Sequence, residues 1–197
     1  MSKAARALIA AALVLLAAPA QAHPPPLGIP GYFGGFLHPM FVPAHLMAVL
    51  ALGLLIGQQR PQWGKAALAA YVLALLAGLT AIAFAFVPER AGEAVLACAA
   101  VCGALTAAAP RLHGAIGGAL AVLTGLAIGL DSPPEVISLR EANLMLLGTA
   151  LGGTLLLLAI AGVASRLLRD WQRIGIRIAG SWIAASAVLV LALRFAR

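Results

Sequence analysis

The chain has 197 residues, of which 63% are hydrophobic and 10% are charged, and its mean hydropathy is +1.04. A soluble domain is about half apolar and about a quarter charged, so this composition excludes an ordinary soluble fold and predicts a membrane protein. The net charge of +7 does not indicate a nucleic-acid-binding face, because the basic residues are scattered in short gaps between apolar runs.

Residues 1–22 have the pattern of a cleavable secretion signal. A short basic region precedes the apolar run Ala7–Ala18, and Ala20-Gln21-Ala22 forms an Ala-x-Ala cleavage site. The run is too short to span a bilayer comfortably. We therefore expect cleavage after Ala22, which makes His23 the first residue of the mature chain. The alternative is an uncleaved signal anchor.

Six apolar segments follow a Pro- and Gly-rich stretch, residues 23–35, which we place in the periplasm or at the membrane interface. A spanning helix needs about 20 predominantly apolar residues. We place six such helices at Pro39–Gln58, Gly64–Val87, Ala91–Ala109, Leu112–Leu130, Ala142–Ala164 and Ile174–Leu193. Because the loops between them are short, residues 23–197 are expected to form a single all-α transmembrane bundle.

The charged residues in the loops predict the orientation of the bundle. If the mature N-terminus lies outside, the inner gaps contain Arg60, Lys65, Arg111, Arg166, Arg169, Arg173 and Arg177. The outer gaps contain Arg90, Arg140 and five of the six acidic residues, Glu89, Glu93, Asp131, Glu135 and Glu141. This distribution follows the positive-inside rule and predicts a multi-pass inner-membrane protein with a periplasmic N-terminus. Arg194 and Arg197 would end outside, against the rule.

Three pairs of glycines lie one helical turn apart, at Gly114 and Gly118, Gly125 and Gly129, and Gly148 and Gly152. Such pairs allow the backbones of membrane helices to approach closely. We expect them to form contacts within the monomer, with an interface between copies of the chain as the alternative.

Ionisable groups in a bilayer are costly and therefore indicate candidate functional residues. His38 and His45 are seven residues apart, on one helix face, and about 10 Å apart along a straight helix. Pro39 and Pro43 could break the helix and bring them nearer. Imidazole binds nickel, cobalt, copper and zinc, so the pair predicts a metal-receiving site near the outer surface. The alternative is that each histidine bonds a backbone carbonyl and only fixes helix packing.

Four further positions are weaker candidates. The terminal amine and imidazole of His23 could chelate a metal, although an unliganded terminus is the simpler interpretation. Glu93 begins a helix, where a carboxylate also favours the helix dipole. Cys98 and Cys102 could be soft ligands but are more typical of packing residues. His113 opens the fourth segment at the inner surface. No nucleotide-binding, hydrolase or zinc-protease motif is present, so we expect no enzyme.

These residues together resemble the HupE/UreJ family of hydrogenase- and urease-associated membrane proteins, regarded as nickel or cobalt permeases. The resemblance rests on the signal with its mature histidine, on Gly35-Phe36-Leu37-His38-Pro39 with His45 seven residues on, and on Gly53–Gln58. Glu93 at the head of the third span, Leu112-His113-Gly114 and the segment 177–185 also resemble family elements. It implies metal-binding roles for His38, His45, Glu93 and His113, with His23 where the ion arrives.

The chain departs from the family pattern at three polar positions. The family has aspartate before its second histidine, where this chain has Ala44. It has a second histidine and an acidic residue in the His-Gly element, where this chain has Gly117 and Leu120. A carboxylate supplies a hard ligand and offsets the charge of an ion in low dielectric, so its loss is expected to weaken divalent-cation binding.

The leading hypothesis is a permease that passes nickel or cobalt inward, with no resident cofactor. An altered ligand set could instead favour copper, with Met40, Met47 and Cys98 as soft ligands. One alternative from another class is a non-transporting accessory protein that assembles a neighbouring complex, such as a hydrogenase or urease maturation partner or a second copy of the chain. Another is a haem-binding protein with two axial histidines.

Overall fold

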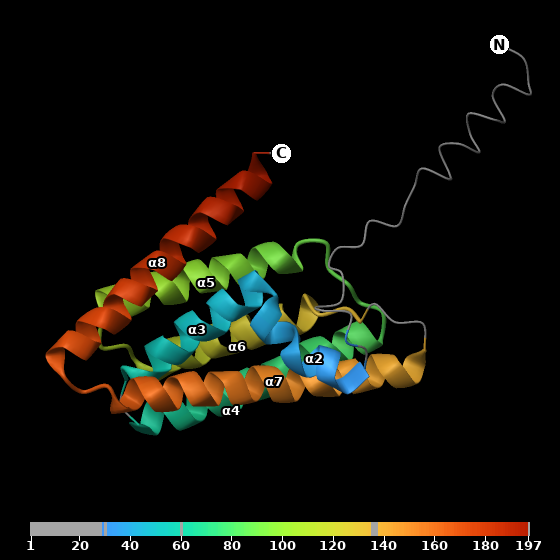
Figure 1. The fold of residues 1–197 in the computed structure, drawn as a ribbon, viewed down its shortest axis with the longest axis horizontal. Helices are drawn as coiled ribbons and strands as arrows, with labels where there is room; N and C mark the ends of the chain where they lie inside the picture. Colours follow the sequence, from blue (N-terminus) through green and yellow to red (C-terminus); the bar gives the residue numbers. More distant parts are fainter. Residues whose placement is uncertain (1–28, 30, 60, 135–137, 197) are drawn as a thin grey trace, which may run out of the picture.

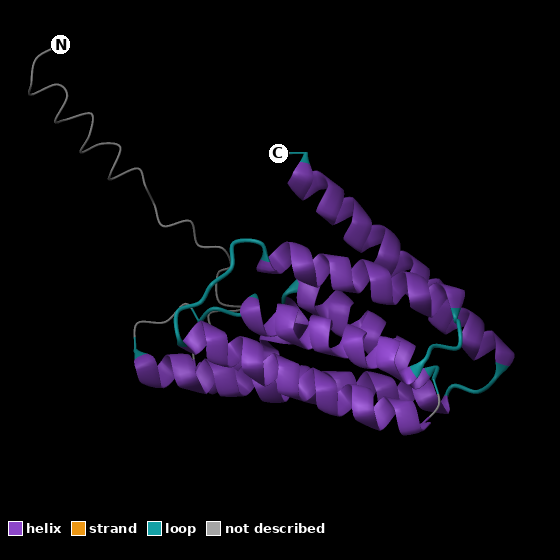
Figure 2. Ribbon diagram, turned by 180° about the vertical axis from the view of Figure 1, so that it is seen from behind, coloured by secondary structure: helices purple, strands orange, loops and turns teal. Residues whose placement is uncertain are grey.

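The computed structural model describes residues 29, 31–59, 61–134 and 138–196, with only the backbone described at 61–63. Within these ranges the chain is helical, with no strand (Figures 1 and 2). The expected signal, residues 1–22, and His23 lie outside the described residues. The described helices are α2 (Gly31–Phe41), α3 (Pro43–Gly57), α4 (Pro61–Ala83), α5 (Ala91–Ala108), α6 (Gly114–Leu130), α7 (Leu139–Arg166) and α8 (Asp170–Phe195).

Each of the six predicted segments coincides with a helix or a helix pair, which confirms the expected all-α, multi-pass architecture. Four helices, α4, α5, α7 and α8, are long and apolar enough to cross a membrane. The pair α2–α3 is bent by 67° at a short break and makes a fifth candidate span. With 17 residues, α6 is a shorter apolar helix, at the lower limit of about 17 residues for a spanning helix.

The helices run back and forth, so the loops collect at two ends of the bundle (Figure 1). We call one end the acidic end, because it contains Glu93 at the start of α5 and Asp131 at the end of α6. The break between α2 and α3 and the last turn of α8 also lie there. The opposite, basic end contains Lys65 near the start of α4, Arg111 before α6, and Arg173 and Arg177 near the start of α8.

Glycines set the contacts between helices. In α7, Gly148 and Gly152 lie against the backbone of α2 at Tyr32 and Phe36, and a Cβ at either position would collide with it. In α6, Gly125 and Gly129 lie against the backbone of α4 in the same way. Both pairs therefore pack within the monomer, as predicted. A Cβ on Gly118, from the third pair, would meet open space.

The first helix begins earlier than the sequence predicted. Residues 31–35, assigned to the Pro- and Gly-rich periplasmic stretch, are the first turn of α2. The reason is tertiary: Gly35 has no side chain, so α2 can lie directly on the backbone of α7 at Met145. This close contact keeps the segment helical, although its composition alone favours a loop.

The last helix packs mainly on α5 and diverges from the rest of the bundle toward its C-terminus (Figure 1). Gly103 in α5 and Gly180 in α8 face each other at their closest approach. Large apolar side chains of α8, including Trp182 and Leu189, are exposed. In a bilayer, lipid covers such a face without cost.

Candidate functional site

The centre of the site is the break between α2 and α3. Val42 has the extended conformation (φ −81°, ψ 111°), because the ring of Pro43 disfavours a helical conformation for the residue before it. Pro39 lacks an N–H, which leaves the carbonyl of Gly35 without its usual helical donor. Thr149 Oγ1 of α7 donates to that carbonyl at 3.2 Å. The broken helix is thus stabilised by a neighbouring helix, as irregular backbone at membrane depth requires.

The break brings the two predicted histidines together. His38 lies in the last turn of α2 and His45 in the first turn of α3, and both are buried. Their ring centroids are 5.0 Å apart, with the planes at 72° in an edge-to-face arrangement. A straight helix would separate the residues by about 10 Å. The expectation that the prolines bring the histidines nearer is confirmed.

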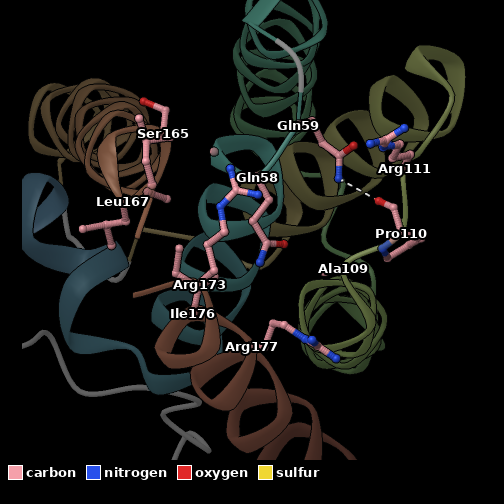
Figure 3. A pocket seen from close by; sticks show the side chains of 13 residues that line it. Gln58, Gln59, Ala109, Pro110, Arg111, Ser165, Leu167, Arg173, Ile176 and Arg177 are labelled. Carbon is pink, nitrogen blue, oxygen red and sulfur yellow. Dashed lines mark hydrogen bonds between the residues drawn. The ribbon is translucent and has the colours of Figure 1, made fainter. Parts of the chain in front are cut away.

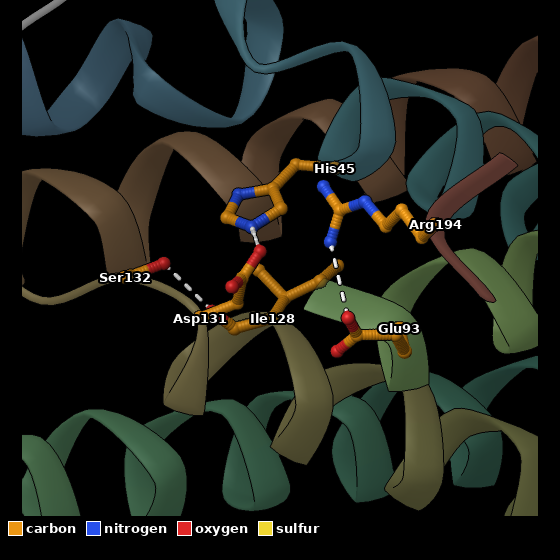
Figure 4. A network of polar contacts seen from close by, with 6 residues as sticks. All are labelled: His45, Glu93, Ile128, Asp131, Ser132 and Arg194. Atoms are coloured by element: carbon orange, nitrogen blue, oxygen red, sulfur yellow. Dashed lines mark hydrogen bonds and ion pairs between the residues drawn. The ribbon is translucent and has the colours of Figure 1, made fainter. Parts of the chain in front are cut away.

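A carboxylate that sequence reasoning did not assign to the site completes it. His45 Nε2 lies 3.0 Å from Oδ2 of Asp131 (Figure 4). Asp131 is the C-cap residue of α6, where the helix ends because Pro133 and Pro134 follow. The next side chain, Ser132 Oγ, donates to the carbonyl of Ile128 at 2.6 Å and secures this last turn.

The contact with Asp131 fixes which nitrogen of His45 is available to a ligand. An ionised carboxylate accepts only, so Nε2 carries the proton and donates it to Asp131. In the neutral imidazole, Nδ1 then has a free lone pair. That atom is buried and has no hydrogen-bond partner among the described residues. Metal-binding histidines commonly donate their other N–H to a carboxylate, which holds the ring in place and makes the ligand more basic.

The predicted carboxylate Glu93 lies close by but is paired with an arginine. Arg194 Nη1 of α8 is 3.8 Å from Glu93 Oε1 (Figure 4). An ideal Cβ on Gly92 would lie 2.7 Å from Arg194 Nη1 and 3.3 Å from Asp131 Oδ1, so these two atoms are at most about 6 Å apart. The guanidinium therefore lies beside both carboxylates. This explains why Arg194 ends at the acidic end, against the positive-inside rule.

The other predicted ligands lie elsewhere. His113 is at the basic end, where its exposed side chain caps α6 by accepting from the backbone N–H of Ala115 at 3.3 Å. Cys102 is buried in the core, and Cys98 and Met47 pack against it. These positions match the packing interpretation of the cysteines. His23 lies outside the described residues.

Within the described part of the chain, no three His, Cys, Asp or Glu side chains are grouped so that they could hold a metal ion together. The site therefore provides the His38–His45 pair and an orienting aspartate. Two imidazoles leave at least half of the positions around a transition-metal ion to water. Such a set is suited to transient binding.

The sequence matches the profile of the family described as HupE / UreJ protein over residues 11–190. The chain belongs to this family. The match covers nearly the whole described bundle. Membership of the HupE / UreJ family implies an accessory membrane protein connected with nickel or cobalt. Comparisons with curated proteins and with solved structures give no match.

Asp131 reaches His45 from α6, 86 residues further along the chain. One sequence signal points to it. An acidic residue at the C-terminal end of a helix opposes the helix dipole, so Asp131 requires a compensating partner.

Proposed function

We propose that this protein is an inner-membrane permease for nickel or cobalt ions, oriented with the acidic end in the periplasm. Its family membership and the geometry of the His38–His45–Asp131 cluster support this proposal. The single observation that carries it is the buried His45, whose Nε2 is held by Asp131 and whose Nδ1 has no partner among the described residues.

In this proposal His45 Nδ1 receives the ion and the adjacent imidazole of His38 supplies a second nitrogen. Asp131 keeps His45 in the required tautomer and offsets part of the charge of the ion. Conduction requires binding that is favourable enough for the ion to enter and weak enough for it to leave. Two imidazoles with water in the other positions meet both conditions better than a closed four-ligand cage.

Glu93 and Arg194 set the charge around the cluster. With both carboxylates ionised, Asp131 and Glu93 contribute two negative charges and Arg194 one positive charge. A divalent ion and a guanidinium repel each other, so Arg194 lowers the affinity for the ion.

Haem binding is not supported by this geometry. Two axial histidines place their nitrogens on opposite sides of an iron, about 2 Å from it on each side, with the porphyrin between the rings. His38 and His45 instead touch edge to face with centroids 5.0 Å apart. No room remains between them for a porphyrin.

A non-transporting accessory role remains the second candidate, favoured by the lack of a three-ligand group among the described residues. Nickel and cobalt accumulation separates the two, measured in cells that lack their own high-affinity uptake. We expect accumulation above the empty vector for the wild type and for His113→Ala, and loss of accumulation for His45→Ala at equal membrane abundance. Accumulation that is absent in the wild type, or that persists in His45→Ala, would favour the accessory role.

A further inference from the structure

The basic end contains two adjoining cavities, of about 290 Å³ and about 510 Å³, that the metal site does not use. They share walls formed by Gly57, Gln58, Gln59, Ser165, Leu168 and Arg173. The smaller volume is at the lower limit, and the larger within, the range of about 300–1,000 Å³ that small-molecule pockets occupy.

The charged lining of both cavities is entirely basic. Arg111 comes from the loop before α6, and Arg173 and Arg177 come from α8 (Figure 3). Lys65, from α4, lines the larger cavity. Among the described residues, no acidic side chain lines either cavity, and none of the four basic side chains forms an ion pair. Arg177 Nε donates to the carbonyl of Ala107 at 2.8 Å, which orients the guanidinium and leaves its terminal amino groups for another acceptor. An anion is the complementary ligand.

The larger cavity adds an apolar wall. Leu68 of α4 and Leu158, Ala161 and Gly162 of α7 line it, and a Cβ on Gly162 would meet open space. A soluble anion does not need such a wall, whereas an acyl chain lies against one. Basic pockets between transmembrane helices are typical sites for the head groups of anionic lipids.

One buried polar atom restricts which lipid head groups fit these cavities. Gln58 lines both cavities, and its buried Oε1 accepts no hydrogen bond from a described residue. Its amide nitrogen reaches the carbonyl of Thr106 at 3.4 Å. A carbonyl oxygen needs a donor, and a phosphate alone does not supply one. A glycerol head group has both the phosphate that the arginines require and hydroxyls that can donate to Gln58.

We propose that the basic end binds an anionic phospholipid with a hydroxylated head group, of the phosphatidylglycerol class. Its phosphate lies among Lys65, Arg173 and Arg177, its hydroxyl donates to Gln58, and an acyl chain follows the wall between α4 and α7. The bound lipid neutralises part of the positive charge at the end of the bundle where a transported cation would leave. The site itself does not depend on metal transport.

Native mass spectrometry of the full-length protein, titrated with phosphatidylglycerol or with zwitterionic phosphatidylethanolamine, tests this proposal. The wild type is expected to bind phosphatidylglycerol at least about tenfold more tightly. The double substitution Lys65→Gln with Arg173→Gln should remove most of this preference. The matched control removes two exposed arginines at the acidic end, Arg90→Gln with Arg140→Gln, and should keep it. The proposal would be overturned if both double variants lost the preference for phosphatidylglycerol equally. It would also be overturned if Lys65→Gln with Arg173→Gln kept that preference.

Two further arms distinguish the sources of the anion. Glycerol phosphate, which lacks acyl chains, should fail to displace the lipid at equal concentration. Displacement at equal concentration would show a site for small anions and would overturn the lipid assignment. Gln58→Leu should reduce the preference for phosphatidylglycerol over phosphatidic acid and leave the binding of both measurable. An unchanged ratio would overturn the assignment of a hydroxylated head group.

Discussion

The contact between Asp131 and His45 gives the sharpest test of the proposed metal site. In Asp131→Ala, the Nε2–H of a fully buried histidine loses its acceptor, which costs about 1–3 kcal/mol of stability. Loss of an orienting carboxylate typically costs about 10–100-fold in metal affinity, or about 1.4–2.7 kcal/mol. We therefore expect both the melting temperature and the affinity for cobalt to fall in this variant.

Asp131→Asn separates the two effects. The amide oxygen can still accept from His45 Nε2, so stability should be largely kept, but the charge is gone and cobalt should bind more weakly than to the wild type. Calorimetric titration of the purified protein with cobalt measures the affinity, and thermal unfolding measures the stability. Glu89→Ala, at an exposed acidic position on the same end, is the control. Wild-type affinity in Asp131→Asn would refute the role assigned to the carboxylate, and wild-type affinity in Asp131→Ala would refute the orienting role as well.

Three further predictions follow from single contacts. Arg194→Gln removes a positive charge about 6 Å or less from Asp131. Because the Arg194 side chain is 40% exposed, solvent screens this charge, and we expect cobalt binding to become more favourable by about 1 kcal/mol, or about fivefold tighter. Arg194→Lys should leave the affinity unchanged, and tightening in both variants would contradict the charge argument. Gly152→Ala forces a Cβ into the backbone of α2 and should lower the free energy of unfolding by about 1–3 kcal/mol. Gly162→Ala on the same helix places its Cβ in open space and should not. Equal melting temperatures for the two variants would contradict the packing described for α7. His113→Ala removes a helix cap and should cost about 1 kcal/mol without lowering metal accumulation, and a loss of accumulation at equal abundance would give His113 a direct role.

The sequence was sufficient to predict the helices, because each span is a long apolar run interrupted by charged residues. It also predicted the approach of His38 and His45, since two prolines between them make a straight helix impossible. The sequence did not predict that the helix before the break begins at Gly31. That start depends on the contact between Gly35 and α7, which is made by residues more than 100 positions apart.

The carboxylate of the site could not be assigned from sequence for the same reason. Asp131 is one of several acids in the predicted outer loops, and its pairing with His45 spans 86 residues. Only its place against the dipole of α6 distinguishes it from the others. Glu93 was predicted as a ligand, but its pairing with Arg194 depends on how α8 crosses α5, which no local pattern encodes. The basic residues were predicted to share one end, although not that they line a cavity.

Nickel flux into liposomes that contain only this protein is the most direct test of the permease proposal. With the ion outside and a chelating indicator inside, we predict saturable flux for the wild type and flux near that of empty liposomes for His45→Ala and Asp131→Ala. His113→Ala should retain flux. Wild-type flux no higher than that of empty liposomes for both nickel and cobalt, or flux unchanged in His45→Ala, would contradict the assignment of a metal permease with its site at the break between α2 and α3.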